Sequence, residues 1–274
     1  MTPARETGKD AYPSTPSLDA SPRRSSALMH TAKRTHGFTE SVIRGMTRLA
    51  NEHGAINLAQ GFPNFPCPDV LKDAAAKAIK DDVNQYAITW GARRLRDALA
   101  RKYRNWYGME ANPETEITVT CGATEAMASA LLAIVDPEDE VIVPEPFYEN
   151  YGPDAILCGA KPVYVPIEAT GSLDLDRFKR AFSEHTRAII LCTPNNPTGR
   201  VLTRAELEGI ATLCVEHDAY AVTDEIYEHI YYEGQHVPIA TLPGMRERTV
   251  TISGASKTFS ITGGGSGPSW PRPR

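Results

Sequence analysis

The sequence predicts an α/β fold built around a mostly parallel β-sheet. From residue 116 onward, short β-rich runs alternate with helical stretches, which is typical of βαβ units. These runs cover residues 117–120, 140–143, 162–165, 188–192, 219–223 and 249–253. In such sheets ligands bind beyond the carboxyl ends of the strands, so the residues that follow each run are the first candidates for a functional site.

Composition excludes several classes of protein. The chain has 274 residues, of which 23% are charged and 41% hydrophobic, as in ordinary globular proteins. A formal net charge of −5 argues against a nucleic-acid partner. No apolar stretch is long enough for a membrane-spanning helix, and the N-terminus lacks the core of a signal peptide. Five scattered cysteines show no metal-ligand spacing, so we expect reduced thiols, no metal site and a cytoplasmic protein.

The N-terminal quarter is predicted to hold a tail and helices. Residues 1–26 are rich in Pro, Ser, Thr and Ala and are expected to be disordered. An amphipathic helix is predicted over 40–52, ended by Gly54. The three prolines in 61–68 predict a shaped loop, with Pro68 in the first turn of the next helix. A second helix is predicted from the spacing of Leu95, Leu99, Tyr103 and Trp106, and both helices are expected to be half-buried.

Two segments after the first strands suit a flat, anionic ligand. Residues 121–125 join a strand to a helix and would present backbone N–H groups and a hydroxyl to a phosphate. A plain turn capped by Thr124 explains the same residues. After the second strand, Phe147 and Tyr148 could stack on a planar heterocycle, or could simply be core aromatics.

Polar groups follow the next strands. In 193–199, Pro194, Pro197 and Gly199 force an irregular backbone that would aim asparagine amides into a cleft, although turn chemistry explains the same residues. Asp224 directly follows an apolar strand, where a buried carboxylate needs a cation such as a protonated pyridine nitrogen. The alternative for Asp224 is a helix N-cap.

Lys257 follows the last of these strands after several small residues. A surface lysine is the default interpretation of any single lysine. Here all of these features, in chain order, point to one end of one sheet. Together they favour a common site over a separate structural explanation for each.

This ordered set resembles the class I/II aminotransferases, which depend on pyridoxal 5′-phosphate (PLP) and share fold type I, from about residue 57 to 263. The most specific segments are 194–199, 224–227 and 256–259. Segments 60–65 and 84–86 resemble the branch that contains kynurenine, glutamine and methionine aminotransferases. The resemblance implies a three-layer sandwich around a mostly parallel sheet.

The resemblance also implies a role for each matched residue. Lys257 would be the Schiff-base lysine and proton shuttle, and Asp224 the partner of the pyridine nitrogen. The other implied cofactor contacts are Asn196 and Tyr227 to the 3′ oxygen, Gly122, Ala123 and Thr124 to the phosphate, Tyr148 stacked on the ring, and Ser256 as a further phosphate ligand. Gly61 would lie near the substrate carboxylate, and Tyr86 would reach the phosphate of the neighbouring subunit in a homodimer.

The domain prediction follows from the same match. Residues 27–60 are expected to form an N-terminal helix and arm, 61–263 an incomplete large PLP-binding domain, and 264–274 a tail outside the family pattern. Family members continue with a Thr-Gly-Trp-Arg-like segment and a small C-terminal domain, and we expect both to be missing here. A one-base deletion could turn codons for Gly-Trp-Arg-Val into those for Gly-Gly-Gly-Ser at 263–266. A natural short form is the alternative.

The expected function is transamination between an L-amino acid and a 2-oxo acid. The family's phosphate-binding and carboxylate-clamping arginines lie beyond the match, so this chain is expected to be poorly stable and impaired in activity. Two alternatives remain open. One is a PLP-dependent cysteine-conjugate β-lyase, and the other is a non-catalytic aminotransferase fragment.

Overall fold

The computed structural model describes residues 31–61, 63, 65–262 and 267–269. The chain divides into two compact units, Met1–His36 and Gly37–Arg274. In the first unit the described residues form the 3-10 turn η1 (Lys33–Thr35). The predicted disordered tail, 1–26, lies outside the described residues. The elements below all belong to the second unit.

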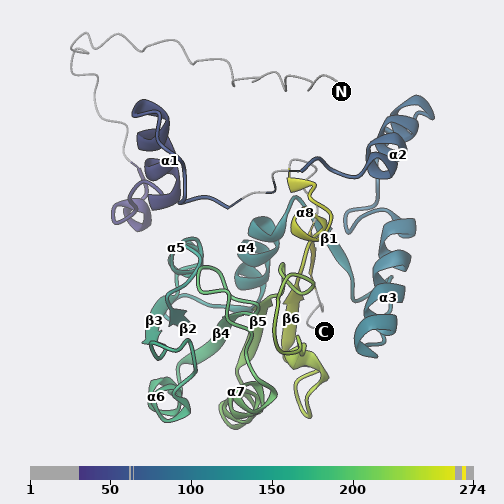
Figure 1. The fold of residues 1–274 in the computed structure, drawn as a ribbon. Helices are drawn as coiled ribbons and strands as arrows, with labels where there is room; N and C mark the ends of the chain where they lie inside the picture. The colour runs from purple at the N-terminus through teal and green to yellow at the C-terminus, as the bar shows by residue number, and fades with distance from the viewer. Residues whose placement is uncertain (1–30, 62, 64, 263–266, 270–274) are drawn as a thin grey trace. The chain divides into compact units, whose positions relative to one another are not determined.

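A seven-stranded sheet forms the centre of the second unit (Figure 1). Its strands are β1 (Thr118–Thr120), β2 (Glu140–Glu145), β3 (Lys161–Pro166), β4 (Thr186–Cys192), β5 (Tyr220–Asp224), β6 (Thr249–Ile252) and β7 (Gly267–Ser269). Their order is β1-β7-β6-β5-β4-β2-β3, with every pair from β6 to β3 parallel. All six predicted strands are found, and the predicted α/β fold with a mostly parallel sheet is confirmed.

Strand β7 lies within 264–274, the segment that was predicted to be a tail outside the family pattern. It runs antiparallel between β1 and β6, with Ser269 opposite both Thr118 and Ile252. Because β7 is antiparallel to both neighbours, β1 points the same way as the parallel strands. Three residues of Gly, Pro and Ser carry no alternation of polarity, so periodicity could not reveal this strand.

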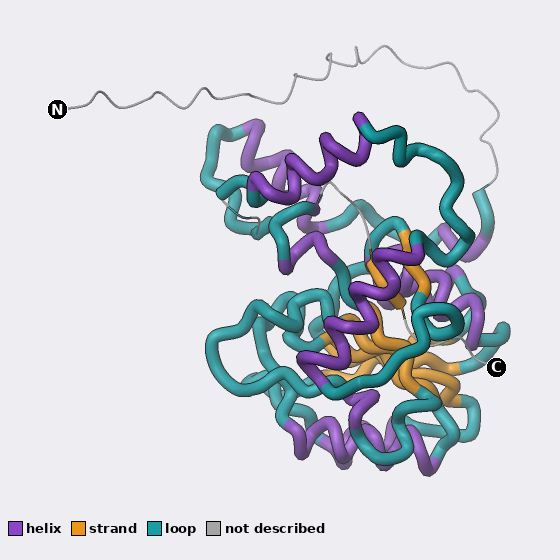
Figure 2. The backbone as a smooth tube through the Cα atoms, turned by 90° about the vertical axis from the view of Figure 1, so that its right-hand side faces the viewer, coloured by secondary structure: helices purple, strands orange, loops and turns teal. Residues whose placement is uncertain are grey.

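Helices cover both faces of the sheet, as the three-layer prediction requires (Figures 1 and 2). Helices α4 (Ala123–Ile134) and α5 (Tyr151–Leu157) pack on one face, and α6 (Leu175–Ala181) and α7 (Arg204–Glu216) on the other. Helix α7 begins with a capping box between Thr203 and Glu206. The 3-10 turn η2 (Ile239–Thr241) packs on the α6–α7 side.

Strand β4 shows how the pleat divides the core into two layers. Ile190 and Cys192 pack with α4 and α5, whereas Ile189 and Leu191 pack with α6 and α7. This follows from the two-residue period of a strand, and a run buried on both faces is typical of parallel sheets. The same period places Asp224 on the α4–α5 face.

The N-terminal helices are α1 (Val42–Glu52), α2 (Asp69–Lys80) and α3 (Arg93–Tyr107). The predicted helix over 40–52 is confirmed, and the Ser41 side chain accepts a hydrogen bond from the Arg44 backbone N–H at its start (3.2 Å). The half-buried prediction is wrong for α2, which has no buried residue, and Pro68 is its N-cap. In α3, Tyr103 is buried but Trp106 is exposed. Periodicity predicts a helix, but not what covers its apolar side.

Two expectations from composition can be set beside the structure. Within the described residues, no helix is long and apolar enough to cross a bilayer. All five cysteine thiols are free, and two of them are buried. The cytoplasmic location stays a prediction.

Candidate active site

The carboxyl ends of three neighbouring strands bring the most specific predicted residues to one edge of the sheet. Asn196 follows β4, Asp224 is the last residue of β5, and Lys257 lies in α8 (Ala255–Thr258), just after β6. In the ladder, Cys192 and Ile252 flank Asp224. These residues therefore lie at the carboxyl ends of the strands, where ligands are expected to bind in such a sheet.

Asp224 is a buried carboxylate whose hydrogen-bond donors are neutral. Its residue is 7% exposed, the Tyr151 hydroxyl donates to Oδ2 (2.7 Å), and the Ile226 N–H donates to Oδ1 (3.1 Å). Burial raises the pKa of Asp224, while these two donors and the charge of Lys257 oppose that rise. Among the described residues, no Lys, Arg or His forms an ion pair with Asp224. The N-cap interpretation is wrong, because a turn and not a helix follows β5.

Lys257 is half-buried, which contradicts the default interpretation of a surface lysine. Its Nζ lies 5.9 Å from the ring centroid of Tyr227, and its charge is close enough to lower the pKa of Asp224. The neighbouring Ser256 is also half-buried, and its carbonyl accepts a hydrogen bond from the Ile261 N–H (3.0 Å). Lys257 thus faces the same space as Tyr227 and Asp224.

The two adjacent asparagines have different tasks. The Asn195 side chain accepts hydrogen bonds from the Thr198 N–H (3.1 Å) and hydroxyl (2.8 Å), which is turn chemistry. The Asn196 side chain instead lies close enough to Tyr227 to lower the pKa of its phenol. Burial raises the pKa of Tyr227 to about 12, and the Asn196 contact opposes that rise. Asn196 and Tyr227 form a polar pair beside Lys257.

The two aromatics after β2 also differ. Phe147 stacks on Tyr164, with centroids 5.4 Å apart, so the core-packing interpretation fits it. Tyr148 makes an edge contact with Tyr151 at 5.8 Å. Burial raises the pKa of Tyr148, with smaller contributions from Glu149 and Asp224. Tyr148 therefore lies close to Asp224, whereas Phe147 packs against Tyr164.

The segment predicted to bind phosphate begins α4. Gly122 is the N-cap, with φ of +90°, and no side chain caps the helix, so the Thr124 cap interpretation is wrong. Ala123 and Thr124 occupy the first turn, where backbone N–H groups lack acceptors within the helix. The carboxylate of Glu125 accepts a hydrogen bond from the Cys121 N–H. A helix N-terminus of this kind suits an anion such as a phosphate.

Replacing Gly122 with alanine is expected to lower the free energy of unfolding by about 1–2 kcal/mol and to weaken PLP binding. A side chain at positive φ is strained, even though the space around the added carbon is open. Urea unfolding and a PLP titration measure the two effects. Gly37→Ala is the matched control, because Gly37 also has open space but no positive φ. Equal unfolding energies for Gly122→Ala and wild type would contradict the prediction.

Gly61 and Tyr86 do not join the strand-end residues. Tyr86 is fully exposed, at 103%, and Gly61 lies in an exposed loop. In the described part of the chain, neither residue contacts Asp224 or Lys257. Two positions of the 60–65 segment, Phe62 and Asn64, lie outside the described residues. The roles given to Gly61 and Tyr86 stay predictions.

The structure adds two residues that the sequence reasoning missed. Tyr151 donates to Asp224, and Cys192 lies beside Asp224 in the sheet. Burial raises the pKa of Cys192 to about 12, so this thiol stays protonated. The two-residue period could have placed Cys192 and Asp224 on one face. No sequence signal showed that α5 covers that face.

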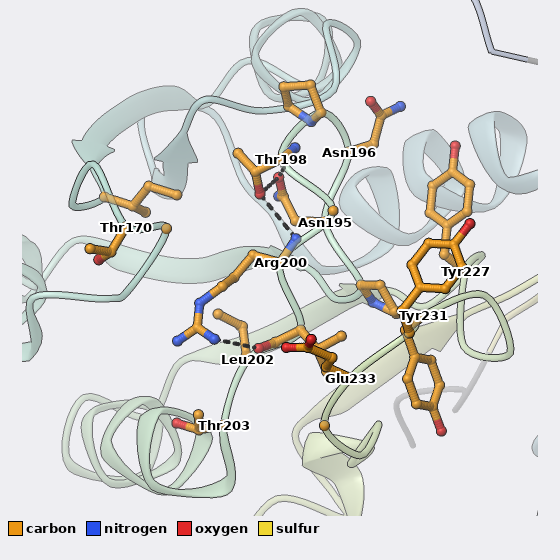
Figure 3. A pocket seen from close by; sticks show the side chains of 18 of the residues that line it. Thr170, Asn195, Asn196, Thr198, Arg200, Leu202, Thr203, Tyr227, Tyr231 and Glu233 are labelled. Atoms are coloured by element: carbon orange, nitrogen blue, oxygen red, sulfur yellow. Dashed lines mark hydrogen bonds between the residues drawn. The ribbon is translucent and has the colours of Figure 1, made fainter.

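An open cavity of about 1340 Å³ adjoins these residues (Figure 3). Asn196 and Tyr227 line it, but Asp224 and Lys257 do not. Figure 3 shows Tyr227 and Tyr231 on one side, with Arg200 across from them. The cavity therefore shares Asn196 and Tyr227 with the strand-end site, whereas the charged side chains of Asp224 and Lys257 lie outside its lining.

Comparison with known proteins decides the family. Residues 53–267 match the model of the family "Aminotransferase class I and II". The chain belongs to this family. The match extends four residues beyond Gly263, where the sequence pattern was expected to stop, and includes the first residue of β7.

Several relatives carry specific names. The chain is 42% identical to human kynurenine–oxoglutarate transaminase 1, over 85% of this chain and 58% of the relative. It is 40% identical to aromatic-amino-acid aminotransferase 2 of Thermococcus litoralis, over 81% of this chain and 58% of the relative. The structure of N-succinyldiaminopimelate aminotransferase from Mycobacterium tuberculosis has a TM-score of 0.86 and 42% identity, covering 88% of this chain and 64% of that one. Such similar identities do not select one substrate.

Members of this family depend on PLP. The chain spans about 60% of the length of the curated relatives that it matches. Its own residues nevertheless fit the cofactor. A buried carboxylate that has no ion pair with any described residue suits a pyridinium nitrogen. Gly122 starts a helix N-terminus suited to phosphate, and Lys257 lies near Asp224.

Proposed function

We propose that the protein uses PLP to transfer an amino group between an L-amino acid and a 2-oxo acid. The observation that carries the proposal is the position of the buried Asp224 carboxylate and of Lys257 at adjacent strand ends, in a chain of the aminotransferase family. A carboxylate held in a buried site by neutral donors is stabilised further by a cation. The protonated pyridine nitrogen of PLP is such a cation.

Each residue has a separate task in this proposal. PLP supplies an electron-withdrawing ring, and Asp224 keeps its nitrogen protonated. Lys257 would hold the cofactor covalently through its Nζ, and the same Nζ, once the substrate amine has displaced it, would carry the proton that leaves the substrate α-carbon. Asn196 and Tyr227 donate to the 3′ oxygen, which fixes the plane of the ring.

The remaining contacts bind and orient. The N–H groups of Gly122, Ala123 and Thr124, with Ser256, hold the phosphate. Tyr148 stacks on the ring. We also propose a homodimer, in which Tyr86 reaches the phosphate of the partner subunit and Gly61 lies near the substrate carboxylate. The full exposure of Tyr86 supports a role outside its own subunit.

Purified protein loaded with PLP is expected to convert amino acids to 2-oxo acids when 2-oxoglutarate is supplied. The donor panel should contain kynurenine, methionine, aromatic amino acids and N-succinyldiaminopimelate, since relatives carry names for these activities. Free PLP without protein is the control, and chromatography of the keto products is the measurement.

Three results would change the proposal. Pyruvate and ammonia released from a cysteine conjugate, without consumption of 2-oxoglutarate, would favour the β-lyase alternative. PLP bound without turnover of any donor would favour a non-catalytic fragment, and the predicted impairment of this chain is measured in the same assay. No absorbance band from bound PLP would contradict the proposal as a whole.

A further inference from the structure

Tyr151 makes a direct, buried contact with the carboxylate at the centre of the proposed site. Its hydroxyl lies 2.7 Å from Asp224 Oδ2, and the residue is 3% exposed. Tyr151 is the first residue of α5, which packs on the sheet face that carries Asp224. The contact joins a covering helix to a strand end 73 residues away in the chain.

The direction of this hydrogen bond is fixed by chemistry. Burial, followed by the nearby Asp224 charge, raises the pKa of Tyr151 well above its ordinary value. The phenol therefore keeps its proton and donates, and the carboxylate accepts. The Ile226 N–H donates to the other oxygen at 3.1 Å. With one donor on each oxygen, the carboxylate retains lone pairs for another partner.

We propose that Tyr151 is a positioning residue whose hydroxyl holds the Asp224 carboxylate, in its anionic form, toward the pyridine nitrogen of the cofactor. The inference rests on the proposed function, because it assigns to Asp224 the task described there. The tight fit of the ring supports it. The Tyr151 ring packs among buried residues of α4, β2 and β4 and against Tyr148, so the hydroxyl has little freedom to turn away.

Removing the hydroxyl would act on the cofactor through Asp224. A carboxylate with one donor fewer is a stronger base, so the proton shared with the ring nitrogen moves toward Asp224. The ring then carries less positive charge, and its Schiff base becomes easier to protonate. The groups around Asp224 that could also titrate come from every neighbouring element: Tyr148, Tyr151, Cys192, Glu225, Tyr227 and Lys257. Of these, Tyr148 and Tyr151 belong to the segment that follows β2.

Tyr151→Phe tests the proposal because it removes one oxygen and keeps the ring. In the PLP-loaded protein, the midpoint of the Schiff-base absorbance change is expected to move to higher pH by roughly half a unit or more. The Kd for PLP should rise about tenfold, because a carboxylate of Asp224 that is no longer held toward the ring nitrogen loses a charge-assisted hydrogen bond to the cofactor. Tyr164→Phe is the matched control, since Tyr164 also packs beside α5 but makes no contact with Asp224.

A double-mutant cycle with Asp224→Asn separates positioning from general stability. If Tyr151 acts through the carboxylate, Tyr151→Phe should leave the absorbance midpoint unchanged in the Asp224→Asn background. An unchanged midpoint and Kd in the single Tyr151→Phe variant would overturn the proposal while leaving the proposed function intact. An equal shift in both backgrounds would also overturn it. Wild-type protein without a PLP band would instead overturn the proposed function and this inference together.

Discussion

Lys257→Ala is expected to abolish covalent attachment of PLP. A Schiff base needs a primary amine, and Lys257 provides it beside Tyr227 and Asp224. After incubation with PLP and reduction by borohydride, mass spectrometry of the wild-type protein should find the adduct on the peptide that contains Lys257. The variant should carry no adduct there, and any amino transfer should fall by at least about 10²–10⁴-fold with the loss of the proton shuttle.

Lys179→Ala is the matched control for this experiment. Lys179 lies on the exposed side of α6, away from the strand ends, so its loss should leave the adduct in place. An adduct on another lysine in the Lys257→Ala protein, at the wild-type yield, would show that Lys257 was wrongly assigned. Non-covalent PLP should still bind weakly to Lys257→Ala if Asp224 and the start of α4 hold it as proposed.

Lys102→Met is expected to lower the free energy of unfolding at neutral pH by about 2–4 kcal/mol. Glu228, just after β5, has a fully buried side chain, and its Oε1 lies 2.5 Å from Lys102 Nζ. Tyr107 donates to Oε2 at 2.7 Å, and Ser253 donates to Oε1. Without Lys102, the carboxylate would remain buried with only neutral donors. Urea unfolding measures the loss.

The pH dependence of this loss has a definite sign. Burial alone would raise the pKa of Glu228, but Lys102, Ser253 and Tyr107 outweigh it and lower the pKa below the ordinary 4.5. The network therefore stabilises the wild type above that pH and loses its effect as the pH falls through the lowered pKa. In Lys102→Met the opposing charge is gone, so the pKa of Glu228 rises. The difference between variant and wild type should shrink on acidification.

Two further variants check the cause. Lys102→Arg keeps a cation and should recover much of the stability. Lys77→Met removes an exposed partner of Asp81 and should cost less than about 1 kcal/mol. A loss for Lys102→Met that stays constant between neutral and acid pH would show that packing, and not the buried charge, causes it. Because Ser253 precedes the Lys257 segment, the Glu228 network also ties the lysine-bearing turn to α3.

Local patterns explain why the sequence predicted the strands and the order of the site residues. Apolar runs such as 188–192 are long enough to predict a buried strand, and parallel strands necessarily end at one edge. Asp224 was informative because a carboxylate at the end of an apolar strand is costly to bury without a hydrogen-bonding or cationic partner. Strand β7 was missed because its three residues have no such pattern.

The sequence by itself determined the α/β class and the six strands before residue 254. It also determined the family, through the order in which Asn196, Asp224 and Lys257 follow one another along the chain. These depend on residue type and spacing along the chain. The tertiary structure alone decided which helix covers Asp224, which of the two asparagines turns the chain, and where the charge of Glu228 is balanced. The contacts of Asp224 and Glu228 join residues 73 and 126 positions apart, and no local periodicity carries information over that distance.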